Sequence, residues 1–219
     1  MNFLPPKISK EDNEELVDYV NRLYEYYLSE LKTEDFNYLG LFIYHNTEPD
    51  VENKDGGFWH IITKDYYKEE TGRVGSNKRR PVELPCKADN GLMVCEHICR
   101  TFHKYDPYRL NEIKYSDGKI AKPRFICLNR CERISWIKAI IKEAEKHPKK
   151  FKIWEKKDRN HQINTHIWYE EEDFLVVLGR WKDESKFNMI TSFVTNYTGK
   201  RRQCEKDYDK YLKNGCNPI

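Results

Sequence analysis

Hydrophobic residues recur along the chain with the period of a helix in two long segments. In residues 131–147 the apolar positions fall three and four residues apart and form one stripe: Ile134, Ile137, Ile141 and Ala144, widened by Ile140. This spacing predicts an amphipathic helix that Pro148 ends, because proline disrupts a helix interior. A similar stripe predicts a helix over residues 9–32 with Ser9 as its N-cap, and a charged helix is expected to close the chain over residues 200–213.

Short apolar segments with strand-like alternation follow the 131–147 helix. Four are predicted to be strands: Phe151–Trp154, Ile163–Tyr169, Phe174–Trp181 and Phe187–Thr195. The connections between them are short and polar, so neighbouring strands should be antiparallel. The predicted fold is therefore α+β, with helices followed by a four-stranded antiparallel sheet. Two earlier segments, Tyr38–Tyr44 and Gly57–Lys64, are also interpreted as strands.

The 219 residues are expected to form an N-terminal helical element over residues 1–50 and a main domain over residues 51–219. The main domain contains a cysteine-rich insertion at about 71–121. No apolar run approaches the ~20 residues of a membrane span, and the first residues lack the pattern of a signal peptide. We therefore expect a cytoplasmic protein without a membrane partner, in which the odd number of cysteines, seven, fits reduced thiols.

Positive charge is concentrated in one part of the chain. Residues 119–162 contain 14 Lys and Arg against 5 Asp and Glu, a net +9, although the whole chain is only +3. A local excess of this size attracts polyanions such as RNA. A solvated lysine-rich surface is the alternative interpretation.

The residue types in this region suit metal-independent cleavage of a phosphodiester. Cations and hydroxyls are plentiful after residue 130, whereas no carboxylate set has the spacing of metal ligands. RNA cleavage of this kind needs a base, an acid and groups that hold the phosphate oxygens, because the 2′-hydroxyl is the nucleophile. His60 is the leading base or acid candidate, since it lies within an apolar segment; a core histidine is the alternative.

Two arginines and a threonine complete the catalytic hypothesis. Arg133 lies near the start of its helix, where the helix dipole favours an anion, or else it is a surface or salt-bridging residue. Arg180 shares a strand face with apolar residues and either snorkels or lines a cleft. Thr191 alternates with Phe187 and Met189, so it should share their face. Further substrate-binding candidates are Arg130, Lys157, Thr165, His166, Ser192 and Thr195, of which Thr165 and His166 should face opposite ways.

Several segments together resemble a phage-associated nuclease family of the Barnase–EndoU–colicin–RelE-like superfamily of metal-independent ribonucleases (BECR fold). The resemblance covers roughly residues 57–213 and is carried by Phe58–Ile61, Arg130–Ile137, Trp154–Lys157, Tyr169–Leu178 and Ile190–Phe193. It implies a helix-plus-antiparallel-sheet endoribonuclease, often a toxin or phage-defence effector.

By this resemblance His60 would act as acid or base, Arg133 and Arg180 would bind phosphate, and Thr191 would donate to an oxyanion or the ribose. RNA is the implied substrate, an immunity or antitoxin protein is a possible partner, and no cofactor is expected.

Two other classes of function stay open. The insertion carries Cys95, Cys99 and His103 at four-residue spacing, which on a helix places all three on one face as an alternative zinc site. Buried, unligated thiols are the competing interpretation. The basic segment could also belong to a non-catalytic nucleic-acid or protein-binding module, including an antagonist that sequesters a protein.

Overall fold

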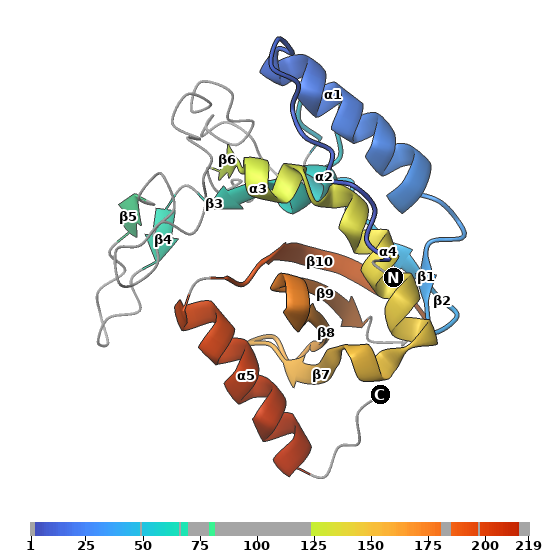
Figure 1. Ribbon diagram of the computed structural model, residues 1–219, viewed down its shortest axis with the longest axis vertical. Coiled ribbons are helices and arrows are strands. Elements are labelled where there is room, and N and C mark those ends of the chain that lie inside the picture. The colour runs from blue at the N-terminus through green and yellow to red at the C-terminus, as the bar shows by residue number, and fades with distance from the viewer. Residues whose placement is uncertain are drawn as a thin grey trace.

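A six-stranded mixed β-sheet forms the centre of the molecule (Figure 1). This computed structural model describes residues 3–48, 50–65, 67–69, 79–81, 124–180, 185–196 and 198–214. The strand order is β1-β2-β10-β9-β8-β7, with bounds Asn37–Tyr38 (β1), Leu41–Tyr44 (β2), Lys152–Lys157 (β7), Ile163–Tyr169 (β8), Phe174–Arg180 (β9) and Phe187–Val194 (β10).

Helices cover both faces of this sheet. On one face lie α1 (Leu16–Tyr26), the π-helix η1 (Tyr27–Leu31), α2 (Gly56–Ile62), α3 (Leu128–Cys131) and α4 (Ile134–Lys146), whereas α5 (Thr198–Lys213) crosses the other face (Figure 1). Two short 3-10 helices are η3 (Pro148–Lys150) and η4 (Glu170–Glu172). Two small ladders pair β3 (Thr63–Asp65) with β6 (Arg124–Ile126), and β4 (Tyr67–Glu69) with β5 (Arg79–Pro81).

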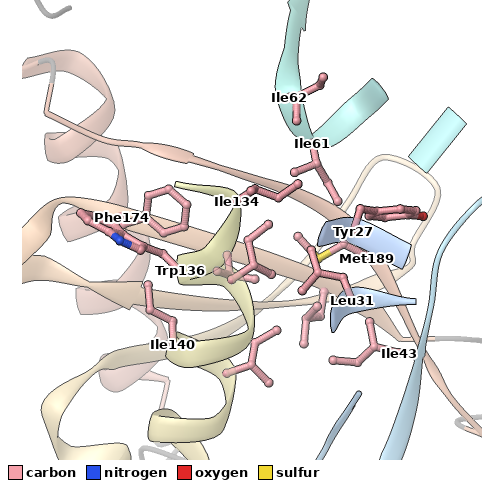
Figure 2. Packing of buried hydrophobic residues seen from close by; sticks show 14 of the residues in the cluster. Tyr27, Leu31, Ile43, Ile61, Ile62, Ile134, Trp136, Ile140, Phe174 and Met189 are labelled. Atoms are coloured by element: carbon pink, nitrogen blue, oxygen red, sulfur yellow. The ribbon is translucent and has the colours of Figure 1, made fainter. Parts of the chain in front are cut away.

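The main core fills the space between α4 and the sheet. Figure 2 shows side chains from η1, α2 and α4 meeting Phe174 and Met189 of the sheet. A smaller cluster lies under α5, where Cys204 packs on Trp154, Trp168, Leu175 and Val177. The two clusters give the sheet a main-core face and an α5 face, and these two names are used below.

The α+β prediction is confirmed, and the sheet is larger than predicted. Strands β7, β8, β9 and β10 pair antiparallel, as expected. The sheet continues beyond β10, because Phe187 and Asn188 pair in parallel with Ile43 and Tyr44 of β2. The four predicted antiparallel strands are therefore part of a larger, mixed sheet. No helix in the described part of the chain has the length and apolar character needed to cross a bilayer.

The N-terminal helix begins later than the predicted residue 9, whereas the segment that carries the hydrophobic stripe, Leu16 to Leu31, is helical as predicted. It begins at Leu16, and Ser9 does not cap it. The residues before it form an extended strap across α4, in which the Pro5 carbonyl accepts a hydrogen bond from Trp136 Nε1 at 3.0 Å. The Ile8 N–H donates to the Glu132 carbonyl at 2.9 Å. These long-range bonds hold the residues before the predicted helix against the segment that joins α3 and α4.

The segment predicted as a strand over Gly57–Lys64 is mostly helical. Helix α2 runs over Gly56–Ile62 and passes directly into β3. Its start packs backbone to backbone on the preceding loop, with the Gly57 N–H 2.6 Å from the Asn46 carbonyl. A Cβ on Gly57 would lie 2.7 Å from that oxygen, so only glycine allows the approach. His60 is the exposed residue of this helix.

Strand β10 contains a bulge that reverses the faces of its second half. The register with β9 shifts between Met189 and Thr191. Phe187 and Met189 lie in the main core, whereas Thr191 pairs with Val177 of the cluster under α5. The expectation that Thr191 shares a face with Phe187 and Met189 is therefore wrong, because a bulge inserts one extra residue into the alternation.

Candidate functional site

Cationic, aromatic and hydroxyl side chains meet at the second half of β10. We call Arg130, Thr191, Phe193 and Lys200 the rim cluster. The guanidinium of Arg130 lies 5.5 Å from the Phe193 ring centroid, and the Lys200 ammonium lies 4.9 Å from the same centroid. Arg130 Nη1 also lies 3.5 Å from Thr191 Oγ1. Two cations from different helices therefore share one aromatic ring beside a hydroxyl.

The local structure explains why these four residues meet. Along β10, strand β2 pairs with the first two residues, Phe187 and Asn188, and helices α2 and α3 also contact β10, where Arg130 of α3 reaches Thr191 in the second half. The bulge turns Thr191 and Phe193 to the α5 face. Helix α5 begins four residues after β10 ends, which places Lys200 in its first turn. The helix dipole adds positive potential at that turn.

Arg130 also joins the rim cluster to the His60 helix. Its Nη1 donates to the Thr63 carbonyl at 2.8 Å and to the His60 carbonyl at 3.3 Å. The guanidinium is thus held against the end of α2, while the exposed His60 side chain extends from the same helix. Among the sequence-predicted residues, Arg130 therefore contacts the Thr191 side chain and the backbone carbonyl of His60.

Arg133 lies elsewhere, at the N-cap of α4. It donates to the Asn129 side-chain oxygen at 2.9 Å, and its guanidinium lies 5.0 Å from the Trp136 ring centroid. The carboxylate of Glu132 is 3.8 Å away. Arg133 therefore contacts the preceding helix α3 and Trp136, the residue that bonds the N-terminal strap.

Arg180 lies at the end of β9 farthest from the rim cluster along the β9–β10 ladder. It pairs with Phe187 across the strands, and its guanidinium lies 5.7 Å from that ring. It forms an ion pair with Glu155 at 3.0 Å. The residue packs on the main-core face, whereas Thr191 faces α5. The structure thus does not bring Arg133 or Arg180 into the rim cluster.

The remaining hydroxyl candidates are buried within the fold. Thr165 and Ser192 are 1% and 2% exposed on the main-core side. Thr195 is fully buried, where its hydroxyl accepts from Trp168 Nε1 and donates to the Asp173 carbonyl. Lys157 is exposed at the end of β7. The hydrogen bonds of Thr195 are structural. The burial of Thr165 and Ser192 on the main-core side separates these two residues from the rim cluster.

His166 lies on the α5 face, opposite to Thr165 as predicted. Its ring stacks on Trp154 with centroids 4.8 Å apart. Burial lowers the pKa of His166 to about 4, and the charges of Lys200 and Lys156 act in the same direction. The imidazole is consequently neutral at physiological pH. The effect of Lys200 on this pKa also places His166 within electrostatic reach of the rim cluster.

The cysteine hypothesis lies mostly outside the described residues, which include neither Cys95 and Cys99 nor His103. Cys127 and Cys131 are described, and both are buried thiols. Burial raises the pKa of Cys131, which keeps it protonated. Within the described ranges, no three His, Cys, Asp or Glu side chains gather as metal ligands.

No known protein family, curated protein or solved structure matches this chain. The residues of the rim cluster therefore have to be interpreted from their own chemistry. Phe193 and Lys200 were not among the sequence candidates. The signal that could have identified Lys200 is its place in the first turn of a helix that directly follows a strand.

Proposed function

We propose that this chain is a metal-independent endoribonuclease of the BECR kind that cleaves RNA by attack of the 2′-hydroxyl. The observation that carries the proposal is the convergence of Arg130 and Lys200 on Phe193, with Arg130 also at Thr191 and at the backbone of the helix that bears the exposed His60. A cationic pair over an aromatic ring suits a phosphate with an adjacent stacked base.

The rim cluster can supply the groups that the reaction needs. The Arg130 fork and the Lys200 ammonium would hold the non-bridging phosphate oxygens, where negative charge increases in the transition state. The Thr191 hydroxyl would donate to the same oxygens. The imidazole of His60 would transfer a proton to the leaving 5′-oxygen or from the 2′-hydroxyl.

The experiment is cleavage of a mixed RNA by the full chain in EDTA, with analysis of the product ends. The expected products carry 2′,3′-cyclic phosphates, and the His60→Ala variant should lose cleavage while it keeps RNA affinity. His147→Ala is the matched control, because His147 is exposed at the far end of α4. Strict dependence on added magnesium would contradict the proposal.

Lys200 offers a test that does not disturb the helix α2 contacts. Lys200→Ala should weaken RNA binding and reduce the slope of log affinity against log salt by about 1, because one phosphate contact is lost. Lys210→Ala, exposed on the same helix but near its other end, should leave both quantities unchanged. Equal effects of the two substitutions would show that the rim cluster is not the phosphate site.

A non-catalytic RNA-binding module is the second candidate. It is favoured by the positions of Arg133 and Arg180, which leave the rim cluster without the two additional guanidinium groups expected for catalysis. Such a module would bind RNA with the same salt dependence and would show no cleavage for His60→Ala to abolish. Toxicity on expression in bacteria, relieved by His60→Ala, favours the nuclease and an antitoxin or immunity partner.

A further inference from the structure

The α5 face of the sheet extends from the rim cluster to strand β2. Tyr44 of β2 pairs with Asn188 of β10, and Asn188 pairs with Gly179 of β9. Residues paired across neighbouring strands share a face, as do residues two apart in one strand. Gly179 therefore shares a face with Val177, which belongs to the cluster under α5 and pairs with Thr191. Tyr44 and Thr191 consequently lie on the same face of the sheet.

Two aromatic side chains reach the surface on the β2 part of this face. Phe42 lies two residues before Tyr44 and so points the same way, whereas Ile43 between them is fully buried in the main core. Phe42 is 40% exposed, and Tyr44 is partly exposed. Helix α5 packs on β7, at the other end of the sheet, and there Trp154 and Trp168 are buried (Figure 1).

A cation lies beside these two aromatic side chains. The Lys186 ammonium is 4.9 Å from the Tyr44 ring centroid. The next residue, Phe187, pairs with Ile43, so the register places Lys186 level with Phe42. We call Phe42, Tyr44 and Lys186 the β2 patch. Like the rim cluster, the β2 patch combines an aromatic ring with a cation at contact distance.

The β2 patch and the rim cluster are separated by a short distance along β10. Thr191 follows Asn188, the partner of Tyr44, by three residues. With about 3.3 Å per residue and about 4.8 Å between strands, the backbones of Tyr44 and Thr191 are roughly 11 Å apart. A single-stranded nucleic acid binds along a surface of this kind, with its phosphates at cations and its successive bases on aromatic side chains. One strand can therefore contact both sites.

We propose that the β2 patch stacks a base of single-stranded RNA that flanks the phosphate held by the rim cluster. This inference rests on the proposed RNA-binding function of the rim cluster. Every base has a π-face, so Phe42 and Tyr44 would add affinity without a preference for one base. The Lys186 ammonium would lie next to the phosphate of the stacked nucleotide. A duplex keeps its bases within its own stack, so the β2 patch would favour single strands.

The test measures the affinity of the full chain for three 2′-O-methyl uridine hexamers. One hexamer is complete, and the other two lack the bases of the 5′ half or of the 3′ half, so all three carry the same phosphates. The 2′-O-methyl group removes the nucleophile, and binding is measured without cleavage. Phe42→Leu and Tyr44→Leu keep an apolar side chain and lose the ring. Each should weaken binding of the complete hexamer roughly tenfold, the value of one stacked base, and leave the affinity for one of the half-abasic hexamers unchanged.

Leu39→Asn is the matched control. Leu39 is 51% exposed on the same hairpin and is not aromatic, and asparagine tolerates its positive φ of 51°. This variant should leave all three affinities unchanged, and Phe42→Trp, which keeps a ring, should bind the complete hexamer at least as tightly as the wild-type chain does.

An unchanged affinity for the complete hexamer in both leucine variants overturns the inference. An equal loss with all three hexamers also overturns it, because no base is then involved. A loss in Leu39→Asn or Phe42→Trp as large as that in Phe42→Leu has the same consequence, since a general apolar surface for a protein partner would behave in this way. In each case the binding that Lys200→Ala weakens is still measured, and the proposed function stands. No binding of any hexamer by the wild-type chain overturns the proposed function itself.

Discussion

The buried His45 makes the stability of this protein depend on pH in a way that can be measured. His45 follows β2 and is 3% exposed, with its ring 5.0 Å from Tyr27 and 5.7 Å from Phe36. Burial lowers the pKa of His45 to about 3; the Lys32 charge adds to this shift and the Leu31 backbone opposes it. The imidazole is therefore neutral in the folded protein throughout the ordinary pH range.

The sign of the effect follows from proton uptake on unfolding. In the unfolded chain the imidazole has its ordinary pKa of about 6.5, so below that pH the unfolded state binds a proton that the folded state does not. The contribution of His45 to stability is complete above pH 6.5 and is lost as the pH falls toward 3. Between pH 8 and pH 5 the loss is about 2 kcal/mol, from about 1.36 kcal/mol per pH unit.

The assay is urea unfolding at pH 8, 7, 6 and 5 for the wild-type chain and for His45→Gln. The glutamine variant starts from a different stability, so the compared quantity is the change in unfolding free energy between pH 8 and pH 5. That change should be smaller in His45→Gln by about 2 kcal/mol. Identical pH dependence in the two proteins would refute the reasoning, because it would mean that His45 titrates alike in both states.

Three further substitutions test individual contacts by urea unfolding. Thr165→Val should raise the free energy of unfolding by about 1 kcal/mol, because the buried Oγ1 has no partner and valine has the same shape. A loss of RNA cleavage in this variant would instead support the predicted role of Thr165 in substrate binding. Gly57→Ala should lower the free energy of unfolding by about 1–3 kcal/mol, since the new methyl would meet the Asn46 carbonyl, and should reduce cleavage by moving α2. Trp136→Phe should lower it by about 1–2 kcal/mol through the lost bond to Pro5, and an unchanged midpoint would show that the strap contributes nothing.

The sequence predicted best those helices and strands whose buried residues all follow the period of a helix or a strand within one continuous segment. Ile134, Ile137, Ile140, Ile141 and Ala144 are all buried, so the helical stripe alone located α4. The four strands after it were found because each has one apolar run bounded by polar turns. In these segments the local pattern and the final packing agree, and no distant contact was needed to decide between helix and strand.

The segment that carries His60 was misassigned because its pattern fits both structures. Phe58, Trp59, Ile61 and Ile62 are buried, and His60 is exposed between them. A short apolar run of this kind is ambiguous between a buried strand and a buried helix. The contact that favours the helix is the close approach of Gly57 to the Asn46 backbone, and the hydrophobic periodicity of the sequence gives no sign of it. The same limit applies to β2, whose parallel pairing with β10 joins segments far apart in the sequence.

The position of the rim cluster depends on one extra residue in β10. If the strand alternated regularly from Phe187, Thr191 and Phe193 would face the main core, with Arg180 and α4. The bulge after Met189 turns them instead toward α5 and Lys200. A strand sequence does not reveal a bulge, because neither neighbour is glycine and the hydrophobic pattern on both sides is intact. Arg130 and Thr191 were therefore accessible from the sequence, whereas Phe193, Lys200 and the face on which the four residues meet depend on the ladder between β9 and β10.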